Sequence, residues 1–242
     1  MTNLQKLQAA YTQVGWIKEN TFKDKDELTN AASNIQRLIA EFMVDNEPKK
    51  KGSFNIWDYV EKDNLHPTMH GVFHDKEGGY AVATETHVLV ADKDLYDESL
   101  VYNGNDYDGR CSVDKYGKFI EGRFPNWKAV IPSNQGDRTK HIISLEDIDA
   151  YIKKCNTYMK LNGMTGRCAR RISFNVPGTD CWFDANILRM FLIASGGEIN
   201  LSDNKHSGVY WGERRTAIVM PIYTDEKSIK EMDCGNGIYL RD

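Results

Sequence analysis

The most informative stretch of the chain is FIEGRFPNWKAVIP, residues 119–132. Residues 118–121 have the alternation of a strand, which Pro125 ends because proline cannot donate to a sheet. Residues 132–137 (PSNQGD) are polar and contain glycine, as connectors between folded units do. We therefore place a domain boundary at residue 136 and work outward from it.

The segment after this boundary alternates between strand and helix patterns. Strands are predicted at residues 142–143, 171–176, 181–183, 198–202, 208–211 and 216–223. One helix begins after Ser144, with Asp147 in the capping position, and runs to Gly163. A second, almost wholly apolar helix covers residues 185–194 and ends at Gly196. The order β-α-β-β-α-β-β-β predicts an α+β fold, with antiparallel sheets and the helices on one face.

The segment before the boundary divides into two parts. Residues 1–50 show helical spacing of apolar residues and predict an N-terminal helical hairpin that ends at Pro48. Strands are predicted at residues 71–74, 79–84, 87–90 and 100–102. The predicted organisation is a hairpin at 1–50, an abbreviated unit at 51–136, a second unit at 137–225 and a C-terminal tail at 226–242.

The composition limits the classes of function. The net charge of the 242-residue chain is −4, so nucleic-acid binding requires a local basic face. The five cysteines are an odd number without C-x-x-C spacing, which indicates reduced thiols rather than a zinc site. No apolar run is long enough to span a bilayer, and the N-terminus lacks a signal core. We expect a soluble, cytoplasmic protein without a cofactor, a metal or a membrane partner.

Three stretches resemble the bacterial DNA sliding clamp, the beta subunit of DNA polymerase III. The first is DNLHPTMHGV at residues 63–72, followed by VATETHVL at 82–89, where the family has V-A-T-D-G-H-R-L. The second is residues 119–132, similar to the family's L-I-E-G-R-F-P-D-Y-R-R-V-I-P. The third comprises FDANIL at 183–188, INLSD at 199–203 and IVMPI at 218–222. They occur in the family's order, and together they cover about residues 54–223.

The resemblance implies a DNA-clamp fold and a divergent relative containing the family's second and third domains. The helical hairpin stands where the first domain would be, and Thr86 and Val88 replace the Gly and Arg of G-H-R-L. In the family such domains form a ring around duplex DNA and act as processivity factors in replication. Two units per chain imply a homo-oligomer, with three chains completing a six-domain ring.

The resemblance also assigns two sites, neither of them catalytic. The family's peptide-binding pocket maps onto Thr84, Thr86, His87, Leu89, Pro132, Val219, Met220, Pro221 and Ile222. Replication proteins are the expected partners there, through short linear peptides. The basic residues expected to contact double-stranded DNA are Lys153, Lys154, Lys160, Arg167, Arg170 and Arg171.

Two other functions stay open at this point. The first keeps the clamp fold but does not encircle DNA, and regulates replication as an interaction module. The second is a hydrolase that uses a cysteine or histidine site. His66, His70 and His74 have four-residue spacing, but Pro67 and Gly71 interrupt the helix that would align them on a metal.

Overall fold

The computed structural model describes residues 10, 12, 31, 34, 35, 38, 39, 52–63, 65–132, 137–164, 171–202 and 207–241. The α-helices with described bounds are α3 (Leu145–Leu161), α4 (Ala185–Ser195) and α5 (Glu226–Met232). Its strands are β1 (Val72–Asp75), β2 (Tyr80–Thr84), β3 (Val88–Asp92), β4 (Ser112–Val113), β5 (Thr139–Ile142), β6 (Arg171–Asn175), β7 (Trp182–Asp184), β8 (Glu198–Leu201), β9 (Gly208–Trp211), β10 (Arg215–Val219) and β11 (Tyr239–Arg241). The predicted hairpin at 1–50 lies outside the described residues, apart from the isolated positions named above, which are helical.

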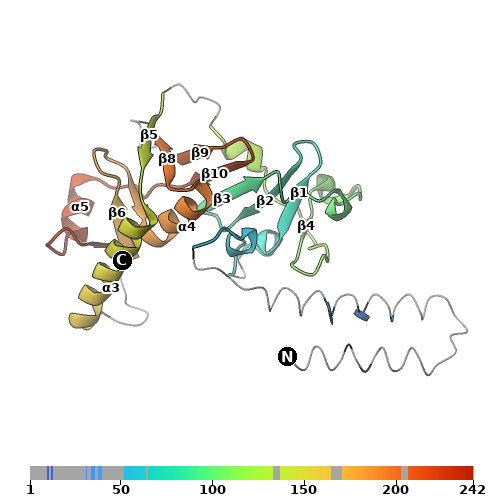
Figure 1. Ribbon diagram of the computed structural model, residues 1–242, viewed down its shortest axis with the longest axis horizontal. Helices are drawn as coiled ribbons and strands as arrows, with labels where there is room; N and C mark the ends of the chain where they lie inside the picture. Colours follow the sequence, from blue (N-terminus) through green and yellow to red (C-terminus); the bar gives the residue numbers. More distant parts are fainter. Residues whose placement is uncertain are drawn as a thin grey trace, which may run out of the picture.

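One long antiparallel sheet joins the two halves of the chain. Its strand order is β4-β1-β2-β3-β10-β9-β8-β5 (Figure 1). The halves meet where β3 pairs with β10, with Val219 opposite Val88. The connector at residues 133–136 lies outside the described residues, so the boundary placed there stays a prediction.

The predicted α+β order of the second half is confirmed as β5-α3-β6-β7-α4-β8-β9-β10. The Oγ of Ser144 accepts the N–H of Asp147 at 3.0 Å and begins α3. Asp184 begins α4 in the same way, by accepting the N–H groups of Asn186 and Ile187. Helix α4 packs on β3, β8 and β10 and against α3, so these two helices share one face of the sheet (Figure 1).

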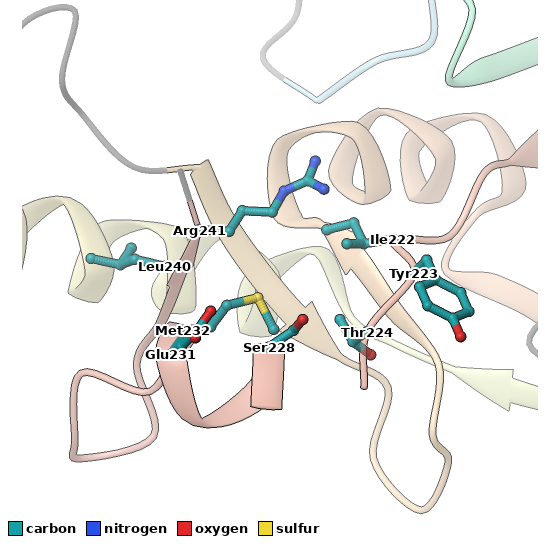
Figure 2. A pocket seen from close by; sticks show the side chains of 8 residues that line it. All are labelled: Ile222, Tyr223, Thr224, Ser228, Glu231, Met232, Leu240 and Arg241. Atoms are coloured by element: carbon teal, nitrogen blue, oxygen red, sulfur yellow. The ribbon is translucent and has the colours of Figure 1, made fainter. Parts of the chain in front are cut away.

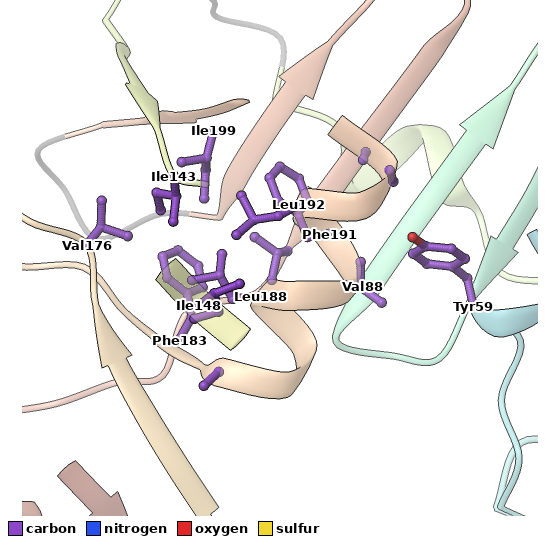
Figure 3. Packing of buried hydrophobic residues seen from close by; sticks show 14 of the residues in the cluster. Tyr59, Val88, Ile143, Ile148, Val176, Phe183, Leu188, Phe191, Leu192 and Ile199 are labelled. Atoms are coloured by element: carbon purple, nitrogen blue, oxygen red, sulfur yellow. The ribbon is translucent and has the colours of Figure 1, made fainter. Parts of the chain in front are cut away.

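The main core lies between α4 and the sheet. Figure 3 shows Leu188, Phe191 and Leu192 of α4 among buried residues that include Ile148 of α3 and Ile199 of β8. The apolar run that predicts this helix therefore faces both α3 and the sheet, as a helix without a polar face must.

The motif at residues 119–132 covers the other face of the sheet. Phe124 and Trp127 are buried in a second cluster with Phe73 and Leu89. The rings of Phe73 and Phe124 stack with centroids 5.1 Å apart. Phe124 and Trp127 thus give the EGRFPNW segment a packing role.

The first half differs from the sequence prediction in its connections. The strand predicted at residues 100–102 is wrong, because residues 98–100 form a 3-10 turn and an irregular segment follows. The strand predicted at 118–121 is reduced to a single bridge between Phe119 and Val113. Tyr102 explains the first difference, because its ring packs edge-on against Phe119 and its hydroxyl donates to Asp106.

Residues 226–241, which the sequence analysis sets apart as a tail, form α5 and β11. Strand β11 pairs with β6 and makes a second sheet of order β11-β6-β7. Leu240 lies opposite Ile172 and is fully buried in the main core. Since Ile238 is buried in the same cluster, this C-terminal extension is part of the folded body.

Candidate functional site

The end of β10 and the turn between β2 and β3 lie side by side. The backbone N–H of Met220 donates to the carbonyl of His87 at 2.8 Å, one residue beyond the last β3–β10 pair. This contact brings most of the predicted peptide-binding residues together, from Thr84 to Leu89 on one side and from Val219 to Ile222 on the other. We call this region the β3–β10 junction.

The turn itself is held by two threonines. The Oγ1 of Thr84 donates to the carbonyl of Val88 at 2.9 Å and accepts the N–H of Thr86 at 3.2 Å. Thr86 has a φ of 79°, a left-handed conformation that favours glycine. The turn therefore holds a threonine in a conformation that this residue disfavours.

Exposure divides the predicted peptide-binding residues into two groups. Leu89 and Val219 are buried in the cores on opposite faces of the sheet and are not available to a ligand. Met220 is 46% exposed, and Tyr223 beside it is 88% exposed. Thr86 and His87 are also exposed, so the accessible part of the junction combines apolar and polar side chains. Pro132 is half-buried and follows the turn at Trp127–Val130.

Glu85 provides a half-buried carboxyl group at the junction. Its Oε1 accepts the N–H groups of His87 and Val88, both at 3.0 Å. Burial raises the pKa of Glu85, and the nearby His87 and these two hydrogen bonds act in the opposite direction. The carboxyl therefore fixes the shape of the turn.

A pocket of about 440 Å³ adjoins the junction on the side of the C-terminal extension (Figure 2). Ile222 and Tyr223 form one wall, and the extension supplies Ser228, Met232 and Arg241. Ile222 also donates its backbone N–H to the carbonyl of Trp182 at 2.7 Å, which ties this wall to β7. The sequence analysis assigns no role to these extension residues, because nothing in their spacing indicates that they return to the junction.

Three of the six predicted DNA-contacting residues lie in the C-terminal half of α3. Lys153, Lys154 and Lys160 are exposed on this helix, and Arg171 is exposed at the start of β6. Arg167 and Arg170 lie outside the described residues. Lys154 donates to the carbonyl of Asn236, so the extension already holds one of these side chains.

The charges on the helix layer are mixed. Helix α3 begins with acidic residues, and one of them, Asp149, forms an ion pair with Arg189 of α4. A hollow of about 650 Å³ between the two helices is lined by Lys153 and Lys160 as well as by this ion pair. Among the described residues of α3, the lysines thus follow the acidic first turn, toward the C-terminal end of the helix.

The hydrolase alternative gains no support from the described part of the chain. Within it, no group of three or more His, Cys, Asp and Glu side chains could hold a metal. Burial raises the pKa of the Cys111 and Cys155 thiols, which disfavours the reactive thiolate. His66 and His70 flank a 3-10 turn while His74 lies in β1, so the three do not align. Among the described helices, none has the length and apolar character needed to cross a bilayer.

No family model matches the chain, and no curated protein matches it. Several solved structures are similar to it. The sliding clamp of Pseudomonas aeruginosa, solved with a ligand, has 13% identity and a TM-score of 0.48 over 69% of this chain and 62% of the clamp. The clamp of Bartonella birtlesii bound to griselimycin has 14% identity, a TM-score of 0.48 and the same coverage.

The Helicobacter pylori clamp bound to a DNA ligase peptide has 12% identity and a TM-score of 0.44, over 70% of this chain and 62% of that clamp. The chain therefore spans about three fifths of the length of the clamps it matches, 62% in each case. Many of the solved structures to which it is similar are bacterial sliding clamps, the family that its sequence motifs resemble.

Proposed function

We propose that this chain is a clamp-like accessory protein of DNA replication that binds short peptides of partner proteins at the β3–β10 junction. The proposal depends on one observation: Met220 is exposed where its backbone is fixed to His87. Exposed apolar side chains that gather at one place mark interaction sites. Methionine also adapts its shape to different ligands, which suits a site that serves several partners.

A peptide titration tests this function. The probe is the DNA ligase peptide bound by the Helicobacter clamp, labelled with fluorescein, and that clamp serves as the positive control. We expect saturable binding to this chain in fluorescence polarisation. Met220→Glu should weaken it by about tenfold or more, since the change places a charge in an apolar contact.

The matched control is Leu95→Glu, at a residue 43% exposed and near the opposite end of β3. This substitution should leave the dissociation constant unchanged. Equal losses with both variants would argue against a site at the junction. If the Helicobacter clamp binds the peptide and this chain does not, the proposed peptide-binding function is wrong.

The second part of the proposal is that three chains encircle duplex DNA. Support comes from the sheet that continues across two units, with α3 and α4 on one face, and from the basic end of α3. A closed ring holds DNA through topology, so a loose attraction to phosphate suffices. Light scattering should give the mass of a trimer, and the protein should stay on nicked circular DNA and slide off when the circle is cut.

A non-encircling interaction module is the alternative, and the mixed charge of the helix layer favours it. The acidic first turn of α3 and the ion pair of Arg189 with Asp149 reduce the positive charge available to DNA. This alternative predicts a monomer at tens of micromolar that binds the ligase peptide and is not retained on circular DNA. The same two measurements therefore separate the functions.

A further inference from the structure

Two arginines face each other where the C-terminal extension joins the body. Arg241 of β11 lies opposite Arg171 of β6 in the antiparallel register, so both side chains are on the same face of the sheet. Like charges at directly opposite positions repel each other and destabilise a sheet. An anion beside the two guanidinium groups would offset this repulsion through charge-assisted hydrogen bonds.

The surroundings of Arg241 leave part of its guanidinium group without a partner. Its Nε is buried and makes no hydrogen bond to any described residue. The nearest carboxylate is that of Asp184, 4.0 Å from the guanidinium, and Asp184 also caps α4. Burial lowers the pKa of Arg241, Asp184 opposes this effect, and Arg171 lowers the pKa further. Arginine still carries its positive charge under these conditions.

The pocket beside Arg241 has the size and lining for a side chain. Figure 2 shows the Arg241 guanidinium on the same side as Ile222, across the pocket from Ser228 and Met232. The one acidic residue in the lining, Glu231, lies 3.8 Å from Lys227. The pocket thus combines a largely polar lining, with Ile222 on one wall, and a guanidinium group.

We propose that Arg241 and Arg171 bind the carboxylate of an acidic residue in a partner peptide whose apolar residues lie on Met220 and Ile222. This inference rests on the proposed peptide-binding function and assigns the extension a role in specificity. Ile222 connects the two sites, because it belongs to the junction and also lines the pocket. A guanidinium group can form two parallel hydrogen bonds to a carboxylate, which an amide of the same shape cannot match.

The chemistry of the pocket favours a peptide over nucleic acid. Its volume of about 440 Å³ suits a side chain, and Ile222 offers that side chain an apolar contact beside the guanidinium group of Arg241. A duplex presents its phosphates on a wide, fully hydrated surface and binds mainly through clustered charge. DNA is therefore the outcome that would contradict the assignment.

The experiment uses synthetic fluorescein-labelled peptides that share a Leu-Phe pair. Each peptide carries a single Asp, at one of three positions before the pair or three positions after it. Every Asp peptide has a counterpart with Asn at the same position. With the full chain, we expect at least one Asp peptide to bind about fivefold to tenfold more tightly than its Asn partner. Arg241→Gln should abolish that preference and leave the affinity for the Asn peptide unchanged.

Two further variants protect the test against misfolding. Arg171→Gln changes an exposed residue and should reduce the preference, while Arg214→Gln, 74% exposed in the turn before β10, should preserve it.

Binding of Asp and Asn peptides with equal affinity would overturn the carboxylate site and leave the junction intact. Absence of all peptide binding, together with failure of the ligase peptide, would remove both proposals. Displacement of the Asp peptide by a short DNA duplex would show that the two arginines bind phosphate, which would contradict the carboxylate site.

Discussion

Arg215 of β10 and Asp92 of β3 pair at the end of the two strands away from the β3–β10 junction, and the Nε of Arg215 donates to Oδ2 of Asp92 at 2.6 Å. The Asp92 side chain is only 1% exposed. Arg215 also donates to the carbonyl of Ala194 at 3.0 Å, and its guanidinium lies 3.4 Å from the ring centre of Phe54. One ion pair therefore connects strand β3, helix α4 and the start of the first half.

Removing the cation of this pair should be costly. Arg215→Met leaves a buried carboxylate without its ion partner, and we expect the free energy of unfolding to fall by about 3–5 kcal/mol. Urea denaturation followed by circular dichroism measures the change. Arg214→Met provides the comparison, because that neighbour is 74% exposed and should shift stability by less than about 0.5 kcal/mol. Similar losses at both positions would mean that the pair is not a stabilising contact.

The two glycines after α4 should respond differently to alanine. Gly196 has a φ of 67° and open space where an alanine Cβ would lie, so Gly196→Ala should cost about 1–2 kcal/mol for the left-handed conformation alone. At Gly197 the φ is 94°, and a Cβ would lie 2.9 Å from the carbonyl oxygen of Ile143. Gly197→Ala should therefore cost more than Gly196→Ala. Thermal unfolding of the two variants ranks them, and the reverse order would contradict this packing.

The C-terminal extension should be necessary for stability. Leu240→Ala removes a fully buried side chain from the main core, with an expected loss of about 2–5 kcal/mol. Tyr223→Ala, at a residue 88% exposed, should change stability little. Chemical denaturation of both variants provides the measurement. A small effect of Leu240→Ala would show that β11 is not docked on β6 in solution.

His74 should make stability depend on pH. Burial lowers its pKa from the ordinary value of about 6.5, with Asp97 acting weakly in the opposite direction. The unfolded chain therefore takes up the proton first as the pH falls. Stability contributed by neutral His74 is complete above about pH 6.5 and is lost as the pH falls from there toward the lowered pKa.

Asparagine at position 74 tests this linkage. The Nδ1 of His74 accepts the N–H of Asp97 at 3.1 Å, and an Asn side-chain oxygen can accept the same bond. We expect His74→Asn to reduce the loss of stability between pH 7 and pH 5, measured by urea denaturation at each pH. The same substitution at the exposed His66 should leave that loss unchanged. An unchanged loss in the His74 variant would exclude this residue as its source.

The sequence predicted the second half of the fold well, because its signals are local. Ser144 is a capping residue directly before an amphipathic helix, and Gly196 marks the end of an apolar one. The junction could be anticipated only through the motif resemblance, since the pairing of β3 with β10 joins positions more than a hundred residues apart.

The extension and the turn of the junction could not be predicted for physical reasons. Helix α5 and strand β11 are too short to show periodicity, and they acquire their structure by packing on β6. The left-handed conformation of Thr86 carries no signal either, because threonine normally avoids it. The position of Arg241 could not be predicted from the sequence either, because it depends on the register between β6 and β11.

Strand β3 has a consequence for how the protein is made. Its final partner β10 is distant along the chain, and Asp92 precedes Arg215 by 123 positions. At ordinary rates of translation this interval takes roughly 6 to 25 s. Throughout that time the nascent chain presents an apolar strand, buried in the finished fold, with one open edge. Until β10 has been synthesised, the unpaired edge of β3 can pair with the strands of other nascent chains on the same polysome.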